Sequence, residues 1–572
     1  MRGCFTRGFA LLPLLVAARA SPPHVLALLL DDYGWADAGW HAGNGSDVRT
    51  PTLDRLVASG IELERQYVFQ VCSPSRSAAQ TGRNPIHVNV QNLDPIFYNR
   101  NDNVSGFAGV PRPMTGIAQL LRDRAGYRTH FFGKWDAGMA TADHLPSARG
   151  YDSALFYFHH MVNYWASTFE NANGAVSHFD SCADAAEKAG LPEGFRPVDL
   201  WRSNATRNAP APVTLRNPPA CDVGDWDICS DEASCPPYPG FPNATQMAGC
   251  TFEDDLFTRA LLEAVDAHEP GNASFFAFWA PHAIHTPLMV PADWYAKFAH
   301  VADWRRRRYL ALVAFIDDRV GAVVARLEER AMWDDLLIVM SSDNGGPIYS
   351  SGAAGANNFP LRGGKASNFE GGVRVNAFVS GGAVPPPMRG RTLAGLSTIW
   401  DWYATLAAAA GIEDVADASA AAAGVPPVDS VSQWDYWRGV NATPPRTMIA
   451  LGLAETPTVQ GVILDAGGGA LWKLLVGEVS EDAWTSESFP NASTTEFPSH
   501  DCGDAGCLFR VDVDPCEYVD LAVSEPTMLA RLQSARDAAQ GGVFYPDRGD
   551  EDAASCVAAV VAHAGTWGPW VV

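Results

Sequence analysis

The sequence predicts an α/β fold in which helices cover both faces of a sheet, followed by a smaller domain built on an antiparallel sheet. Three observations predict it. Short apolar runs alternate with helical patterns, four of the apolar runs end in polar clusters, and the pattern changes beyond residue 445. With 572 residues, 47% of them hydrophobic, and 18 tryptophans, the chain can bury a large core.

The first predicted strand covers residues 24–30 and ends at Asp31 and Asp32. Three further predicted strands also end in polar residues: 127–132 leads to Gly133-Lys134-Trp135-Asp136, 275–279 to His282 and His285, and 336–340 to Ser341-Ser342-Asp343-Asn344-Gly345-Gly346. In α/β sheets ligands bind outside the carboxyl ends of the strands. These clusters are therefore the candidate site.

Helical patterns separate the strands, at residues 52–59, 116–124, 254–267 and 309–329. Residues 170–250, rich in proline, cysteine and glycosylation sequons, predict a disulfide-tied surface insertion within a first domain of residues 21–444. Residues 445–572 predict the smaller antiparallel-sheet domain, from short apolar runs at 447–453, 459–464, 470–476 and 508–513.

The N-terminus has the pattern of a secretory signal peptide over residues 1–20. Arg2 and Arg7 precede the apolar run 9–16, and Ala18-Arg19-Ala20 is a small-x-small cleavage site. No later stretch is apolar enough to span a membrane. We expect a soluble protein of the secretory pathway, in an extracellular or lysosome-like compartment. Seven N-x-[S/T] sequons agree with this route, at Asn44, Asn103, Asn204, Asn243, Asn272, Asn441 and Asn491.

Ten cysteines remain after Cys4 leaves with the signal, and the oxidising route favours disulfides for them. The regular Cys-x-x-Cys pairs of a zinc site are missing. Two groups are expected to form disulfides: Cys182, Cys221, Cys229, Cys235 and Cys250 in the insertion, and Cys502, Cys507, Cys516 and Cys556 near the C-terminus. Cys72 stands apart from both groups.

The chain is acidic, with 41 basic and 65 acidic side chains and a net charge of −24. Such a surface repels nucleic acids and anionic membranes, so neither is an expected partner. An anionic substrate would need a local positive site.

Cys72 opens the segment Cys72-Ser73-Pro74-Ser75-Arg76, which a Thr81-Gly82-Arg83 turn follows. Pro74 suits the first turn of a helix, and the helix dipole favours negative charge at that end. The C-x-P-S-R pattern with its T-G-R turn resembles the signature of the type I sulfatases. In that family the cysteine is oxidised to formylglycine in the endoplasmic reticulum, which implies a formylglycine-generating enzyme as a partner during maturation.

Further blocks of the same family follow in order, so that the resemblance covers residues 22–525. They are Leu30 to Trp35, Gly133-Lys134-Trp135, Arg149 to Asp152, Ala280 to Pro291, Ser342 to Gly346, Leu361 to Lys365, Glu370 to Val375, and Leu508 to Glu517. The spacing and the tract Gly82 to His87 look nearest to the arylsulfatase B branch. The resemblance implies the alkaline-phosphatase-like fold, a large mixed sheet flanked by helices with a small C-terminal sheet.

The metal site follows from donor chemistry and from the resemblance together. Asp31, Asp32, Asp343 and Asn344 offer hard oxygen donors, which suit calcium or magnesium rather than zinc. The resemblance implies one calcium ion, with the modified Cys72 as a further ligand. As a hydrated aldehyde, residue 72 would attack sulfur and pass through a sulfo-enzyme intermediate.

The same resemblance implies roles for four charged residues. Arg76 would hold the hydrate of residue 72, Lys134 and Lys365 would clamp the sulfate, and His285 would contact the sulfate and help the leaving oxygen depart. Taken alone, Asp31 and Asp32 are more typical of a helix cap, Lys134 and Lys365 of surface charges, and His285 of a buried histidine. Because all of them fall at motif positions of one family, the catalytic roles are favoured.

One position departs from the family pattern. Asp136 stands where the G-K-W-H block has histidine, the residue credited with taking a proton from the hydrate. A carboxylate can also act as a base, and nearby Lys134 would lower its pKa. Three outcomes stay open: Asp136 substitutes, His144 replaces it from the following loop, or turnover is impaired. We favour substitution, because the other predicted ligands and clamps are present.

These residues predict a sulfuric ester hydrolase acting on a sulfated sugar or an aryl sulfate. A phosphodiesterase or phosphonate hydrolase of the same superfamily is an alternative, and so is a protein that binds sulfated glycans without turnover. The family motifs do not reach the loops that build the leaving-group pocket, so the substrate itself stays open.

Overall fold

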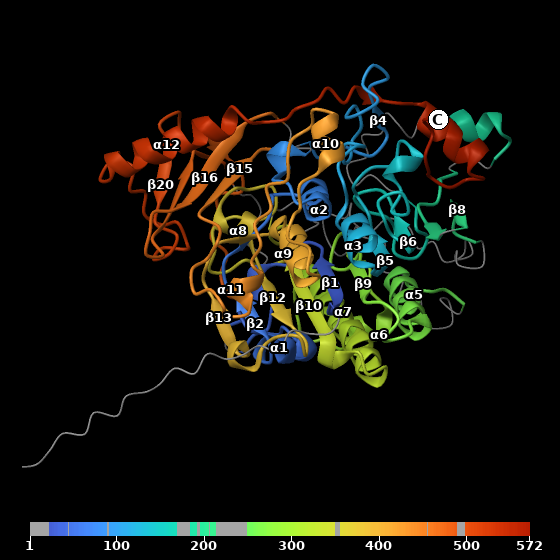
Figure 1. The fold of residues 1–572 in the computed structure, drawn as a ribbon, viewed down its shortest axis with the longest axis horizontal. Coiled ribbons are helices and arrows are strands. Elements are labelled where there is room, and N and C mark those ends of the chain that lie inside the picture. Colours follow the sequence, from blue (N-terminus) through green and yellow to red (C-terminus); the bar gives the residue numbers. More distant parts are fainter. Residues whose placement is uncertain are drawn as a thin grey trace, which may run out of the picture.

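The computed structural model describes residues 22–572 except 44, 89–90, 169–183, 192–194, 205, 213–248, 349–354, 455 and 489–497. Its centre is a ten-stranded sheet (Figure 1). In spatial order the strands are β13 (Arg391–Leu393), β2 (Ile61–Leu63), β12 (Ala377–Ser380), β10 (Leu336–Ser342), β1 (His24–Leu30), β9 (Phe275–Ala280), β5 (Arg128–Lys134), β6 (Ser153–Tyr157), β7 (Trp201–Asn204) and β8 (Arg207–Pro210).

The five central strands, β10, β1, β9, β5 and β6, run parallel to one another. β1 is buried along its whole length, as expected for a strand covered on both faces. β12 and β7 pair antiparallel to the flanks of this parallel block, so the sheet is mixed. The four strands expected at residues 24–30, 127–132, 275–279 and 336–340 are all present and adjacent.

Helices flank the sheet in two packed groups. One contains α1 (Pro51–Ala58), α5 (Glu253–Ala267), α6 (Ala292–Ala296) and α7 (Trp304–Glu329); the other contains α2 (Cys72–Thr81), α3 (Ile117–Ala125) and α9 (Asp401–Ala409). The four helices expected between strands are confirmed, although α7 begins five residues before the predicted start at 309. No helix in the described part of the chain is both long and apolar enough to cross a membrane.

A smaller antiparallel sheet forms from β15 (Met448–Gly452), β16 (Val459–Asp465), β17 (Leu471–Leu475) and β20 (Cys507–Phe509). α12 (Pro526–Gln540) packs on β16 and β17, beside the sheet in Figure 1. The antiparallel sheet is confirmed. The strand expected over 508–513 is shorter, because the backbone carbonyl of Arg510 accepts hydrogen bonds from Val513 and Asp514 and starts a turn there.

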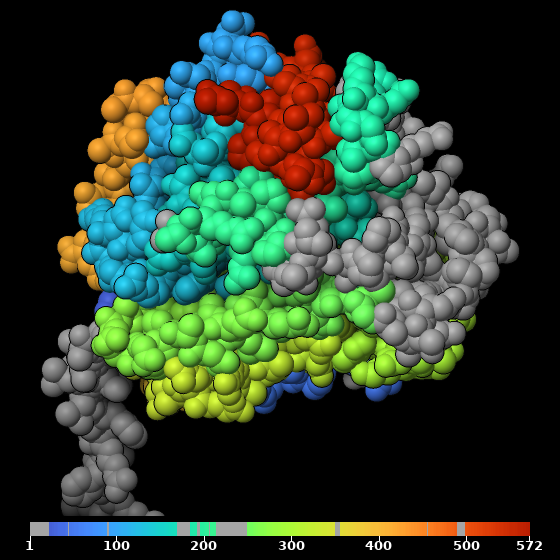
Figure 2. Space-filling view, turned by 90° about the vertical axis from the view of Figure 1, so that its right-hand side faces the viewer, coloured from blue at the N-terminus to red at the C-terminus, as the bar shows by residue number. Residues whose placement is uncertain are grey.

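The last thirty residues leave this sheet and return to the main body. β21 (Asp550–Glu551) pairs with β4 (Phe97–Tyr98), and Val571 forms a bridge with Thr141. The returning segment crosses the top of Figure 1 and packs between earlier segments in Figure 2. Trp567, fully buried, anchors it. Domain limits at 21–444 and 445–572 therefore stay a proposal, because residues assigned to the second unit pack against the first.

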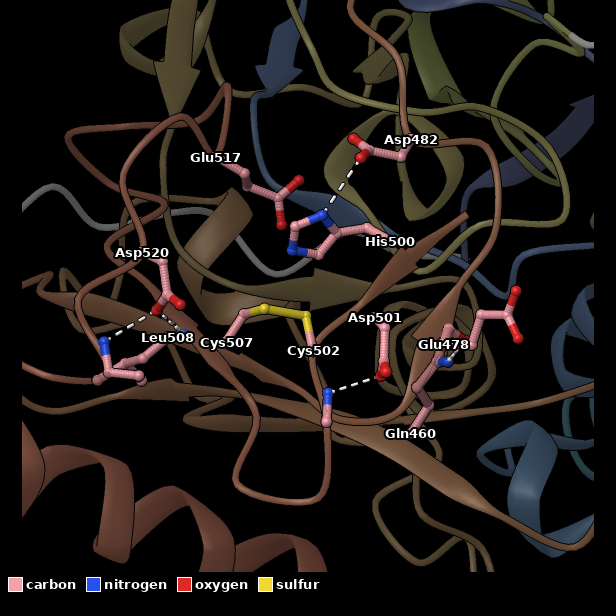
Figure 3. The surroundings of a disulfide bond; sticks show 12 residues. Gln460, Glu478, Asp482, His500, Asp501, Cys502, Cys507, Leu508, Glu517 and Asp520 are labelled. Carbon is pink, nitrogen blue, oxygen red and sulfur yellow. Dashed lines mark hydrogen bonds and ion pairs between the residues drawn. A yellow bond between two sulfur atoms is a disulfide. The ribbon is translucent and has the colours of Figure 1, made fainter. Parts of the chain in front are cut away.

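One disulfide is fully described, between Cys502 and Cys507, with an S–S distance of 2.07 Å (Figure 3). Cys250 and Cys556 are disulfide-bonded as well. The expected disulfide at Cys516 is wrong, since this cysteine has a free thiol. The signal peptide, most of the 170–250 insertion with its other four cysteines, and the sequons at Asn44, Asn243 and Asn491 lie outside the described residues.

Candidate active site

The carboxyl ends of the parallel strands bring the predicted site residues together. Asp31 and Asp32 follow β1, and Asp343 and Asn344 follow the neighbouring β10 in parallel register, with Leu30 paired to Ser342. The backbone amide of Asp32 donates to Asp343 Oδ1 at 3.3 Å. All four side chains are fully buried or nearly so. The prediction that these polar clusters meet at one edge of the sheet is confirmed.

Cys72 is the first residue of α2, a helix whose residues are all buried. Its Sγ lies 3.6 Å from Asp31 Oδ1. Burial, and then the charges of Asp31 and Asp343, raise the pKa of the Cys72 thiol well above its ordinary range. The unmodified side chain is therefore a neutral thiol and a poor nucleophile.

Arg76, one turn along α2, joins the two halves of the carboxylate cluster. Its Nε and Nη2 lie 2.9 Å and 2.8 Å from Asp343 Oδ2, and Nη2 lies 3.0 Å from Asp31 Oδ2. Nη1 donates to the backbone carbonyl of Lys134 at 3.1 Å. The guanidinium thus fixes Asp31 and Asp343, two metal-ligand candidates, and also the carboxyl end of β5.

Two lysines contact the two aspartates that follow β1. Lys134 Nζ donates to Asp31 Oδ2 at 2.7 Å, and Lys365 Nζ donates to Asp32 Oδ2 at 3.0 Å. Burial works against the charge of Lys134, but Asp31 and Cys72 outweigh it and raise its pKa. The chain contains only five lysines, and two of them lie in this site, each bound to one aspartate.

His285 completes the ring beside Lys365. Its Nδ1 lies 2.7 Å from the backbone carbonyl of Thr286 and must donate to it, so Nε2 faces Lys365 Nζ at 3.0 Å and Asp32 Oδ2 at 3.6 Å. Burial, then Lys365 and Lys134, lower the pKa of His285 well below its ordinary value. The imidazole is therefore neutral and exposes its acceptor nitrogen to the site.

The donor set fits a hard divalent cation. Ligand atoms of Asp31, Asp32, Cys72 and His285 all lie within 4.8 Å of one another. Asn344 Oδ1 is buried and has no hydrogen-bond partner among the described residues, while its Nδ2 donates to Asp32 Oδ1 at 2.7 Å. Burial, and next the charge of Asp31, raise the pKa of Asp343 to about 7. A cation here would satisfy the orphaned oxygen and offset the crowded carboxylates.

Asp136 lies at the same edge, just beyond β5, with a left-handed backbone conformation (φ 46°). Its Oδ1 is 3.0 Å from Ser73 Oγ and 3.0 Å from His160 Nδ1. Its Oδ2 is 3.8 Å from Lys134 Nζ. The proposed rescue by His144 is not supported, because this histidine is buried and its Nδ1 caps the turn at Thr141, 2.9 Å from its hydroxyl.

His160 is the site residue that the sequence analysis missed. It follows β6, which pairs with β5 in parallel register, Lys134 opposite Tyr157. The rule that picked out the other clusters, a polar side chain directly after a buried strand, could have found it at Tyr157-Phe158-His159-His160. His159 instead contacts Asp199 at 2.7 Å and is fully buried.

The model of the sulfatase family matches residues 23–412, which is most of the chain and includes every site residue described above. The chain belongs to the sulfatase family. Sulfatases are hydrolases of sulfate esters, and members of the family use a formylglycine and a metal ion. The described cluster of acidic residues around residue 72 is where this sulfatase would hold both.

Two curated relatives and one solved structure illustrate the similarity. Arylsulfatase J of Mus musculus is 27% identical over 574 residues, which cover 97% of this chain and 81% of that protein. N-acetylgalactosamine-6-sulfatase of Sus scrofa is 27% identical over 405 residues, 70% of this chain and 65% of that protein. The crystal structure of PsFucS1 sulfatase from Pseudoalteromonas sp. has a TM-score of 0.67 at 21% identity and covers 92% of each chain, which supports the fold.

These findings bear on the alternatives left open by the sequence. The family match and the relatives support sulfate ester hydrolysis, and neither favours phosphodiester or phosphonate chemistry. The presence of both lysines, the arginine and the acidic cluster in one buried site also argues for turnover rather than for glycan binding alone.

Proposed function

We propose that this sulfatase is a calcium-dependent enzyme in which Cys72, oxidised to formylglycine, provides the nucleophile. One observation carries the proposal: residue 72 starts a buried helix 3.6 Å from Asp31, inside a ring of carboxylates and cations. A neutral, buried thiol contributes only one weak hydrogen bond, to Asp31, in such a ring. Oxidation to an aldehyde would give the position a reactive group.

Asp31, Asp32, Asp343 and Asn344 would hold the calcium ion together with residue 72. The hydrated aldehyde supplies the oxygen that attacks sulfur, and the metal supplies positive charge that lowers the pKa of that oxygen. Arg76 fixes the carboxylates of Asp31 and Asp343 relative to each other, so both would be held in place for a metal. The crowded carboxylates, with Asn344 Oδ1 lacking a partner among the residues that the structure describes, support this ligand set.

Lys134 and Lys365 bind the sulfate group in this proposal. Their ammonium groups lie on Asp31 and Asp32, next to residue 72, so they can stabilise negative charge as it builds up on the sulfonyl oxygens. His285 presents Nε2 beside Lys365, and this atom is placed to contact the sulfate and to exchange a proton with the leaving oxygen. Asp136 takes the place of the family's histidine as the proton acceptor.

The maturation route is also part of the proposal. Asn103, Asn204, Asn272 and Asn441, the sequon asparagines among the described residues, are all exposed, as glycosylation requires. Together with the disulfides and the signal pattern at residues 1–20, they support passage through the secretory pathway. A formylglycine-generating enzyme would act on residue 72 there. The mature enzyme would then work in an extracellular or lysosome-like compartment.

The proposed substrate is a sulfated sugar, with an aryl sulfate as the simpler alternative. Support comes from a relative named for a sulfated amino sugar and another named as an arylsulfatase. The net charge of −24 favours a small or sparsely sulfated substrate at low ionic strength, because a densely sulfated polymer would be repelled over a Debye length of about 10 Å at 0.1 M salt.

Mass spectrometry of the peptide that contains residue 72 tests the proposal directly. An aldehyde in place of the thiol, together with release of sulfate from a panel of sulfated monosaccharides and aryl sulfates in calcium, is the expected result. An unmodified cysteine in active enzyme would overturn it. Bis-aryl phosphate and phosphonate esters assayed beside the sulfates should give far lower rates, and the reverse order would favour phosphoester chemistry.

A further inference from the structure

His160 and Asp136 form a pair at the edge of the site, with the carboxylate buried and the imidazole partly exposed, and the parallel sheet is the reason they meet. β5 and β6 are neighbours in register, so the residues that follow their carboxyl ends lie side by side. His160 comes three residues after β6, and Asp136 comes two residues after β5. The family's histidine position and this second histidine therefore share one corner of the site.

The contacts within this corner fix the orientation of the carboxylate. Asp136 Oδ1 lies 3.0 Å from His160 Nδ1 and 3.0 Å from Ser73 Oγ, next to residue 72 in the chain. Asp136 Oδ2 is buried without a hydrogen-bond partner among the described residues, and 3.8 Å from Lys134 Nζ. One oxygen is thus fully engaged by the protein, and the other is left for the site.

His160 is held in turn from its far side. Its Nε2 lies 3.5 Å from Asp94 Oδ1, and its Nδ1 also lies 3.1 Å from Ser73 Oγ. The imidazole is therefore placed between two carboxylates, an environment that favours the doubly protonated ring. Of the charged groups around the pair, Asp94 acts on His160, Lys134 acts on both members, and Arg76 acts on Asp136.

The pKa directions agree with this geometry. Burial would raise the pKa of Asp136, but the charge and hydrogen bond of His160, and then Lys134 and Arg76, lower it overall. Burial would lower the pKa of His160, but Asp136 and Asp94 raise it. Lys134, the cause predicted from the sequence, does lower the pKa of Asp136, but His160 is the larger cause.

We propose that His160 is a positioning residue for catalysis: as a cation, it orients and ionises Asp136 so that Asp136 Oδ2 can accept a proton in the site. The inference rests on the proposed function, in which Asp136 replaces the family's histidine. When a sulfated hydrate of residue 72 breaks down, its free hydroxyl would give its proton to Asp136 Oδ2. The O–H electron pair would then form the carbonyl bond, the C–O bond to the sulfate would break with its electrons leaving on the sulfate, and Asp136 would pass the proton to water. Asp136 is neutral only between these two transfers, and His160 keeps its own proton throughout.

This pairing predicts an enzyme whose base stays ionised in acidic solution. Because His160 lowers the pKa of Asp136, the carboxylate keeps its charge to lower pH, and loses it only as the pH falls through that lowered pKa. A lone histidine in the family's position would already be protonated below its ordinary pKa of about 6.5. The exchange of histidine for an aspartate–histidine pair thus suits an acidic compartment.

The first test is the pH dependence of kcat for His160→Asn, whose side-chain amide can still donate at the position of Nδ1 but carries no charge. The acidic limb of the profile should move to higher pH by about 1 unit, because an opposite charge at this distance lowers a carboxyl pKa by about 1–3 units. His87→Asn is the matched control, since His87 pairs with Asp429 through Nδ1 at similar exposure but outside the site. An unmoved limb in His160→Asn would overturn the inference.

A second variant covers the case in which His160→Asn misfolds. Asp94→Asn removes the outer carboxylate and leaves His160 in place, so the acidic limb should move in the same direction by a smaller amount. If the acidic limb of Asp94→Asn lies at the same pH as in the wild type, the proposed effect of Asp94 on Asp136 through His160 is contradicted.

The third measurement does not depend on activity. In protein labelled with ¹³C at histidine Cε1 and kept as unmodified Cys72, the signal absent from His160→Asn should titrate above the ordinary histidine pKa, and Asp136→Asn should lower that value. A His160 signal that titrates at or below about 6.5 and ignores Asp136→Asn would refute the pair. If the pair titrates as expected but Asp136→Asn keeps wild-type kcat, the proposed function of Asp136 fails instead.

Discussion

Lys473 is a fully buried lysine at the junction between the small sheet and the main body. Its Nζ lies 3.0 Å from Glu370 Oε1 and 3.0 Å from Glu517 Oε1, and all three side chains are 0% exposed. Glu517 Oε2 in turn accepts the backbone amide of Glu370 at 2.7 Å. Glu370 opens α8 (Glu370–Val373), where the carbonyl of Gly372 accepts the amide of Gly345, next to Asn344. The cluster thus helps to fix the loop that contains Asn344, a metal-ligand candidate.

Lys473→Met keeps most of the aliphatic length of the side chain and removes its charge. Two carboxylates would then face each other in the interior, with Arg374 3.7 Å from Glu370 as the remaining cation. Breaking a buried ion pair by removing one partner costs about 3–5 kcal/mol, because the charge left behind is uncompensated. That is a large part of the roughly 5–15 kcal/mol by which a domain is stable. We expect a loss of this size in the free energy of unfolding.

Urea unfolding followed by tryptophan fluorescence measures the effect, with Lys188→Met on the exposed surface as the control. Burial raises the pKa of Glu517 to about 7 even though Lys473 lowers it, so in Lys473→Met the folded state should bind a proton more tightly than the unfolded state. The loss should therefore shrink as the pH falls from 8 to 5, and Glu517→Gln added to Lys473→Met should recover part of it. A loss below about 1 kcal/mol at pH 8, or one that grows as the pH falls, would refute the reasoning.

Three further outcomes are expected. Chelation by EGTA should abolish turnover, and Asp343→Asn should lose calcium binding in titration calorimetry; full activity in EGTA would contradict the metal assignment. Lys134→Ala should lower kcat by about 10²–10³-fold, the cost of removing one donor to developing charge, whereas Lys297→Ala outside the site should not. Trp567→Ala should cost about 3–5 kcal/mol in urea unfolding, because this ring is fully buried, while exposed Trp484→Ala should cost much less.

The parts of the site predicted from the sequence share a physical reason. Asp31 and Asp343 each follow a short apolar run, and Lys134 follows a segment that ends in two phenylalanines. All three segments are strands of one parallel block, and parallel strands present their carboxyl ends at one edge. Cys72 and Arg76 are separated by one helical turn, so their common face follows from helix geometry. The first relation follows from parallel strands and the second from the spacing within one helix. Both can be inferred from the pattern of the sequence.

Contacts between loops that are distant in the chain could not be predicted from the sequence pattern. The pairing of His160 with Asp136 depends on which strand neighbours β5, and an alternation of strands and helices does not state that order. The free thiol of Cys516 depends on which cysteines come close in space, which their spacing does not fix. The return of Trp567 to the main body depends on packing between segments 366 residues apart in the chain, where its backbone carbonyl accepts the indole N–H of Trp201.

The charge of the site explains how an acidic chain can bind an anionic ester. Three carboxylates, Asp31, Asp32 and Asp343, face three cations, Arg76, Lys134 and Lys365, so this inner set is neutral as the protein provides it. The Asp136–His160 pair is neutral too, because it contributes one charge of each sign. A calcium ion would therefore leave the site with two positive charges inside a chain of net charge −24. Affinity for sulfate should thus depend on the metal rather than on the lysines alone, since the carboxylates already balance the lysines.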